Sequence, residues 1–144
     1  MPAAPAGLPK SFALCQPLCL NDMALNRKLM ASNDMQNMNL EGVVAKHWKD
    51  VQPKELVYPG FSTRLLWSGP NGRRALIFEI APGAVYPDLD VHAPGAEEVF
   101  VLSGTFCDGK NSYPAGTFIH HPAGTSHIPQ SIEGCMLFVY FPEG

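Results

Sequence analysis

The stretch DLDVHAPGAEEVFVLSG, residues 88 to 104, begins with acidic residues around one histidine and ends in an apolar run typical of a buried strand. Alternate side chains of an extended strand share one face, so Asp90 and His92 are expected to point the same way. Glu97 follows the turn APGA and can swing back beside them. The stretch therefore predicts a strand with potential metal ligands at its start. Two alternatives follow, a metal site or a polar cluster without a metal.

A second stretch, GTFIHHPAGTSH at residues 116 to 127, supplies further histidines, of which His127 follows its own turn. Two histidines and two carboxylates that converge from neighbouring strands offer nitrogen and oxygen donors and no thiolate. This donor set is typical of sites for Fe²⁺, Mn²⁺, Ni²⁺ or Zn²⁺ and not of a structural zinc finger. Without a metal, Asp90 and Glu97 would repel each other in a low-dielectric interior, and one of them would take up a proton.

Two adjacent histidines, His120 and His121, lie inside this second stretch. Neighbours in a strand face opposite sides, so at most one of them can point into a barrel. His121 precedes Pro122, a position that favours extended backbone. We expect these two histidines to orient a metal-binding side chain or to lie at the surface, and not to bind a metal directly.

The rest of the chain from Glu41 onward indicates an all-β protein, because short apolar runs alternate with turn residues. The segments between the runs contain the Gly, Pro, Asn and Asp that tight turns need, and none is long enough for a βαβ crossover. The sequence therefore predicts an antiparallel sandwich or barrel. The expected strands are residues 55–59, 61–68, 73–81, 98–106, 116–122 and 135–141.

Composition and charge place the chain among globular, loop-rich proteins. Its 144 residues suffice for one domain, and they are 46% hydrophobic and 16% charged. The net charge of -3, without a basic run, argues against binding to nucleic acid. No apolar segment approaches the roughly 18 residues of a membrane span. We expect residues 1–40 to form an N-terminal arm outside the barrel and residues 41–144 to form the domain.

The four cysteines are too few and too scattered for a disulfide scaffold, which indicates a reducing compartment and predicts a cytoplasmic protein. Six aromatic residues either line a pocket or, as is more usual for aromatic residues in strands, belong to the core; they are Trp48, Trp67, Phe78, Phe100, Phe138 and Tyr140. Glu79 interrupts an apolar run, so it lies either on the wet side of an edge strand or in a polar pocket. The sequence leaves these alternatives open.

The spacing of the two stretches resembles the paired motifs of the cupins. The first motif is matched by Gly83, Asp90, His92, Glu97 and Gly104, and the second by Gly116, Pro122, Gly124 and His127, with Ser131 where the motif has Asn. Within the cupins, roughly residues 47 to 144 are most similar to the ChrR-like domain, which occurs at the C-terminus of some zinc-dependent anti-sigma factors and also alone. The departures are Asp90 in place of the first histidine, one extra residue between Gly83 and Asp90, and Ser131.

The resemblance implies a small antiparallel β-barrel of the jelly-roll type that holds one metal on Asp90, His92, Glu97 and His127. The implied ion is Fe²⁺ first, with Zn²⁺, Mn²⁺ or Ni²⁺ as alternatives. The implied function is a dioxygenase-like enzyme acting on a small carbonyl or phenolic compound, and the alternative is a non-catalytic sensor module that binds a metal or a small molecule. We expect a homodimer, and no direct control of a sigma factor, because no zinc domain is recognisable ahead of residue 47.

Overall fold

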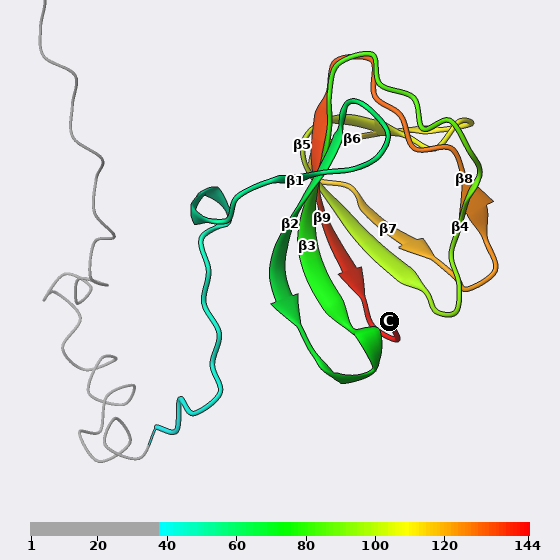
Figure 1. The fold of residues 1–144 in the computed structure, drawn as a ribbon. Helices are drawn as coiled ribbons and strands as arrows, with labels where there is room; N and C mark the ends of the chain where they lie inside the picture. The colour runs from blue at the N-terminus through cyan, green and yellow to red at the C-terminus, as the bar shows by residue number, and fades with distance from the viewer. Residues whose placement is uncertain (1–37) are drawn as a thin grey trace, which may run out of the picture. The chain divides into compact units, whose positions relative to one another are not determined.

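The computed structural model describes residues 38–144 (Figure 1). Contacts within the chain divide it into two units, Met1–Val43 and Val44–Gly144. In the first unit, the described residues are exposed and contain one turn, in which the Val43 amide donates to the Leu40 carbonyl at 3.1 Å. The arm expected over residues 1–40 lies almost wholly outside the described residues and stays a prediction.

The second unit is built from antiparallel strands, which confirms the all-β fold class. The strands are β1 (Lys54–Glu55), β2 (Phe61–Ser68), β3 (Arg74–Ile80), β4 (Asp90–Val91), β5 (Glu97–Cys107), β6 (Ser112–Pro114), β7 (Phe118–His121), β8 (Ser126–His127) and β9 (Cys135–Phe141), with short 3-10 turns at η1 (Trp48–Asp50) and η2 (Pro70–Gly72). Within residues 38–144, no helix has the length and apolar character needed to cross a membrane.

The strands form two sheets that face each other across the barrel. The larger sheet has the order β1-β2-β3-β9-β5-β6, with β7 also paired to β5, and the smaller sheet consists of β4 and β8. Figure 1 shows β4 and β8 on the opposite side of the barrel from β2 and β3. The interior between these sheets is where side chains from distant parts of the sequence meet.

The longer strands follow the sequence pattern closely, and the shorter ones do not. Strands β2 and β9 have the expected bounds, whereas the strand expected at 55–59 shrinks to Lys54–Glu55. Strands β4, β6 and β8 were not expected, because pairing over two or three residues leaves no periodic pattern in a sequence. Two of these three, β4 and β8, carry candidate ligands.

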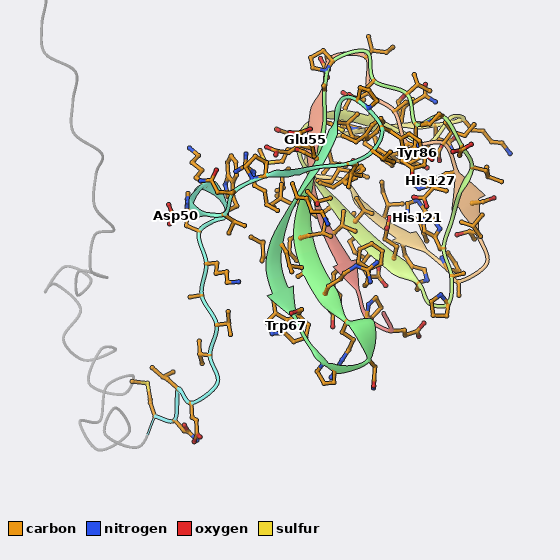
Figure 2. All side chains as sticks on the ribbon, viewed as in Figure 1. Asp50, Glu55, Trp67, Tyr86, His121 and His127 are labelled. Carbon is orange, nitrogen blue, oxygen red and sulfur yellow. The ribbon has the colours of Figure 1, made fainter. Side chains whose placement is uncertain are left out.

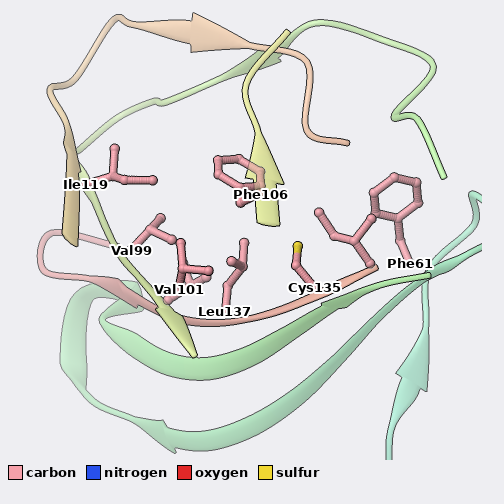
Figure 3. Close-up of a cluster of buried hydrophobic side chains, with 9 residues drawn as sticks. Phe61, Val99, Val101, Phe106, Ile119, Cys135 and Leu137 are labelled. Atoms are coloured by element: carbon pink, nitrogen blue, oxygen red, sulfur yellow. The ribbon is translucent and has the colours of Figure 1, made fainter. Parts of the chain in front are cut away.

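The core follows the period-two pattern of β5 and β9. Val99 and Val101 are buried on β5, whereas Phe100 between them is 39% exposed. On β9, Leu137 and Val139 are buried on the same inner face (Figure 3). Side chains that alternate in this way fix which face of β5 looks into the barrel, and this face includes position 97.

Gly104 shows why the first motif ends in glycine. It lies within β5 at φ 71°, and a Cβ there would collide with the carbonyl oxygen of Gly134. Residues with side chains rarely adopt this left-handed conformation, and here the neighbouring backbone leaves no space for one. Glycine at this position therefore lets β5 pass close to the start of β9.

The fold shows the surroundings of Glu79 and of Cys135. Glu79 lies on β3, which is flanked by β2 and β9, so it is not on an edge strand; it lines a second pocket of about 390 Å³. Its carboxylate pairs with Arg64 Nε at 3.0 Å and accepts from Ser62 Oγ at 3.2 Å. Cys135 is buried and unpaired, and burial raises the pKa of its thiol to about 11. It behaves as a small hydrophobic residue.

Candidate metal centre

The pairing of β5 with β7 places one glutamate and one histidine inside the barrel. Glu97 lies directly opposite His121, and Glu98 lies opposite His120. Directly opposite residues project to the same face, so the two pairs lie on opposite faces of the sheet. The His121 and Glu97 side chains are 11% and 12% exposed, whereas that of His120 is 51% exposed. His121 therefore points inward, which the sequence analysis did not assign.

The pairing of β4 with β8 places Asp90 directly opposite His127. The distance from Asp90 Oδ2 to His127 Nε2 is 3.4 Å. The two side chains differ in exposure, because that of His127 is 7% exposed and that of Asp90 is 41% exposed. Asp90 thus lies at the solvent-exposed edge of the cluster, beside the buried imidazole of His127.

His92 is held in place by Thr125. Its ring Nδ1 lies 2.9 Å from Thr125 Oγ1, and that hydroxyl donates its only proton to the Pro122 carbonyl at 2.7 Å. The hydroxyl oxygen can therefore only accept from the imidazole, so Nδ1 carries a proton. In the neutral ring this leaves the lone pair on Nε2, which is buried and has no hydrogen-bond partner. Metal-binding histidines are commonly oriented in this way.

Three imidazoles meet at the inner wall of the barrel. One ring nitrogen from each of His92, His121 and His127 lies within 4.8 Å of the others, and the ring centroids are 4.5 to 4.8 Å apart. Figure 2 shows His121 and His127 close together beside β7 and β8. Glu97 joins them, because its Oε1 is 3.6 Å from His92 Nε2 and 3.6 Å from His121 Nδ1.

The polar atoms of this cluster lack partners. Among the described residues, five buried side-chain nitrogen or oxygen atoms have no hydrogen bond, and four of the five belong to these histidines: His92 Nε2, His121 Nδ1 and both ring nitrogens of His127. Buried polar atoms are normally paired, and leaving them unpaired costs free energy. A divalent ion among them would satisfy several at once, so the residues present fit a metal.

Glu97 is ionised in this environment. Burial is the largest influence on its pKa and raises it, but the imidazoles of His121 and His92 together outweigh burial and lower the pKa to about 2. The carboxylate of Glu97 in turn raises the pKa of His92, against the opposing effect of burial. Of the two carboxyls expected to compete for a proton in the absence of a metal, Glu97 is therefore not the one that takes it up, because its interactions with His121 and His92 lower its pKa.

The cluster forms one wall of a pocket of about 610 Å³. Asp90, His92, Glu97 and His127 line it, whereas His121 does not. The rest of the lining is mostly apolar and includes Leu76, Phe78, Tyr86, Phe106, Leu137 and Phe141. Of the aromatic residues considered from the sequence, only Phe78 lines the pocket. Phe141 was missed, although it shares the parity of Leu137 and Val139 on β9.

Solved structures of similar fold come from several kinds of protein. The polyketide cyclase RemF from Streptomyces resistomycificus is 22% identical, with a TM-score of 0.59 over 71% of this chain and 80% of that one. A chain of the Rhodobacter sphaeroides SigE complex with the anti-sigma ChrR is 23% identical, with a TM-score of 0.58 over 87% and 68% of the two chains. The iron enzyme Fe(II)-HppE, solved with the alternative substrate (S)-1-HPP, is 15% identical, with a TM-score of 0.58 over 70% and 60%.

At these identities the structural likeness shows the fold alone, and none of the curated proteins matches this chain in sequence. A family model is more specific. The model of the ChrR cupin-like domain matches residues 42–142, which include both motif stretches and every residue of the cluster. The chain therefore belongs to the ChrR cupin-like domain family.

Proposed function

We propose that this protein is a metal-dependent, dioxygenase-like enzyme that acts on a small carbonyl or phenolic compound. The observation that carries the proposal is the convergence of buried, unpaired imidazole nitrogens and the ionised Glu97 on the wall of a largely apolar pocket. A perturbed carboxyl in a pocket is a common mark of a functional site. An apolar pocket with a few convergent polar groups is the usual form of a small-molecule site.

The proposed metal ligands are His92, Glu97 and His127. The motif supplies Asp90 as the candidate for a fourth coordination position. Nitrogen and oxygen donors without a thiolate favour Fe²⁺, with Mn²⁺, Ni²⁺ and Zn²⁺ as alternatives. When bound, such an ion supplies Lewis-acid chemistry, which polarises a carbonyl or phenolic oxygen.

The protein's own residues orient the ligands and limit water. Thr125 fixes the tautomer and ring plane of His92, so the Nε2 lone pair faces the cluster. Phe78, Phe106 and Phe141 present apolar surface to a bound compound. A flat, mainly apolar molecule with one or two carbonyl or phenolic oxygens is therefore the substrate class that the pocket favours, with its oxygens toward the histidines.

The test is oxygen consumption by the protein loaded with Fe²⁺ under anaerobic conditions and then mixed with single compounds in air-saturated buffer. The panel contains β-diketones and hydroxyacetophenones. We expect at least one compound to be consumed with stoichiometric uptake of O₂, and no uptake with protein that has been stripped of metal. If no compound is turned over although the iron is bound, the enzyme proposal is wrong.

The second candidate function is a sensor module that binds a metal or a small molecule without turnover. It is favoured by membership of the ChrR cupin-like domain family, since a chain of the complex between SigE and the anti-sigma ChrR has a similar fold. In that case, carbonyl compounds from the same panel raise the melting temperature of the metal-loaded protein, and O₂ is not consumed. The cytoplasmic location and the homodimer stay predictions, to be checked by fractionation and by light scattering.

A further inference from the structure

We propose that His121 binds the metal directly, and that Asp90 is not needed to retain the ion. This inference rests on the metal centre of the proposed function and assigns its ligands. The set becomes His92, Glu97, His121 and His127, which are three imidazoles and one carboxylate. His121 is absent from the paired motif positions, so only its place in the structure assigns it this role.

The first argument is the spacing around Glu97. Two neighbouring ligand atoms that each lie about 2.0–2.2 Å from one ion are about 2.8–3.1 Å apart in octahedral and about 3.3–3.6 Å apart in tetrahedral arrangements. His121 Nδ1 lies 3.6 Å from Glu97 Oε1, the same distance as His92 Nε2 from that oxygen. The two histidines thus stand in equivalent positions relative to the carboxylate, at a separation that suits ligands of a shared ion.

The second argument is that His121 is a poor hydrogen-bond partner for Glu97. A distance of 3.6 Å is longer than a nitrogen-oxygen hydrogen bond, which is about 2.7–3.2 Å. His121 Nδ1 is buried and has no partner among the described residues. A histidine that only oriented Glu97 would be expected to close this gap, as His120 does with Glu98 at 2.8 Å on the outer face.

The third argument is the position of Asp90 relative to the pocket. Asp90 lines the pocket and its side chain is 41% exposed, whereas His121 does not line the pocket and its side chain is 11% exposed. His121 therefore approaches the cluster from the protein side, stacked on the His92 ring at 4.5 Å. Water solvates the charge of Asp90 in part, so this carboxylate depends less on an ion for its stability than the buried groups do.

The experiment compares metal retention in the full-length wild-type protein with three variants: His121→Ala, Asp90→Ala and His120→Ala. His120→Ala is the matched control, because it removes the same side chain one residue away on the outer face. Each protein is purified without added metal, analysed by inductively coupled plasma mass spectrometry, then stripped and titrated with Co²⁺ in competition with a chelator. Circular dichroism and a thermal melt of the stripped proteins check the fold.

We expect one ion per wild-type chain and a loss of Co²⁺ affinity of more than about 100-fold in His121→Ala, because removing a residue that merely supports a ligand already costs about 10–100-fold. Asp90→Ala and His120→Ala should remain within about threefold of the wild type, well below that range. Equal affinity in His121→Ala and the wild type would overturn the inference while leaving the metal centre intact. So would a loss in Asp90→Ala as large as that in His121→Ala.

A spectroscopic readout keeps the test independent of the variant's folding. The electron spin echo modulation of the Cu²⁺-loaded wild type reports the number of imidazoles on the ion, and we expect three, falling to two in His121→Ala. If His121→Ala does not fold, His121→Asn replaces it in the comparison. The wild-type count decides even without a variant, because a count of two imidazoles contradicts the inference. A wild type that binds no metal in any form instead refutes the proposed function itself.

Discussion

Two glutamate-histidine pairs lie one residue apart on the same two strands, and they behave in opposite ways. Glu98 and His120 face outward and form a hydrogen bond of 2.8 Å, with side chains that are 27% and 51% exposed. Glu97 and His121 face inward, are nearly buried, and stand 3.6 Å apart without a hydrogen bond. The outer pair forms its hydrogen bond directly, although the second carboxylate oxygen, Glu98 Oε2, is buried without a partner among the described residues.

The difference teaches that the chemistry of a pair does not decide its role. The inner pair is buried, where a direct hydrogen bond would be strongest, yet its atoms are held apart. The rings of His92 and His127 both lie against the His121 ring. Such spacing leaves buried nitrogen and oxygen atoms free to bind a metal ion. The outer pair lies outside this cluster of three imidazoles, although one of its atoms, Glu98 Oε2, is also buried without a hydrogen-bond partner within residues 38–144.

The largest effect is expected from removing the carboxylates one at a time. Glu97→Ala deletes the group that faces both His92 and His121, so we expect metal retention to fall below detection. Glu98→Ala removes the equivalent outer group and should retain metal at the wild-type level. Metal content after purification measures both. Similar metal contents in the two variants would break the distinction between inner and outer pairs.

The pH dependence of the metal-free protein sharpens the same contrast. The pKa of Glu97 is lowered from 4.5 to about 2, so its stabilising effect is present above pH 4.5 and is lost as the pH falls toward 2. The pKa of His92 is raised above 6.5, so its contribution is present below pH 6.5 and is lost as the pH rises beyond that value.

We therefore expect the stripped protein to gain most from this cluster between pH 4.5 and 6.5. Urea unfolding from pH 2.5 to 8 is the measurement, with Glu97→Gln and Glu98→Gln as the compared variants. In Glu97→Gln the acid dependence should flatten by an amount on the order of 2–3 kcal/mol. An identical pH profile for the wild type and Glu97→Gln would contradict the buried charge cluster.

A smaller effect is expected at the support of His92. Thr125→Val removes the hydroxyl that accepts from His92 Nδ1 while keeping the side chain's shape, so the ring loses its fixed tautomer. We expect metal affinity to fall by about 10–100-fold. Thr125→Ser keeps the hydroxyl and serves as the control in the same Co²⁺ competition titration. An unchanged affinity in Thr125→Val would show that neighbouring rings alone orient His92.

The smallest effect is expected on the outer face. His120→Ala removes an exposed ion-pair partner, and exposed pairs contribute about 0–1 kcal/mol, so the free energy of unfolding should change by no more than that. Urea unfolding at pH 7 checks it, with metal content as the second readout. A loss of metal in this variant would show that the two faces of β5 and β7 are coupled, and would weaken the comparison of the two pairs.

The sequence predicted the fold from local signals. Turn residues and period-two runs were enough to define β2, β5 and β9, because each side chain's preference for the inner or outer face is set by its own polarity. The spacing of His92, Glu97 and His127 also indicated one shared site before any tertiary contact was known. Asp90 was placed with them, and its role as a ligand remains a prediction.

His121 shows where that reasoning stopped. The alternation of Phe118, Ile119, His120 and His121 contained the answer, because buried Ile119 and His121 share a parity and His120 does not. The parity of a four-residue strand is ambiguous, however, until its partner strand and register are known. The sequence analysis therefore recognised that only one histidine could point inward, without identifying which.

What the sequence determined by itself is an antiparallel all-β fold with potential metal ligands in two short stretches, residues 88–104 and 116–127, because these properties depend on residues close together in the chain. Only the tertiary structure decided that His121 lies opposite Glu97 and that Phe141 lines the pocket. It also decided that Asp90 is partly exposed to solvent beside His127. These placements depend on register between strands that are distant in sequence. The hydrogen bonds and packing of the assembled sheets set that register.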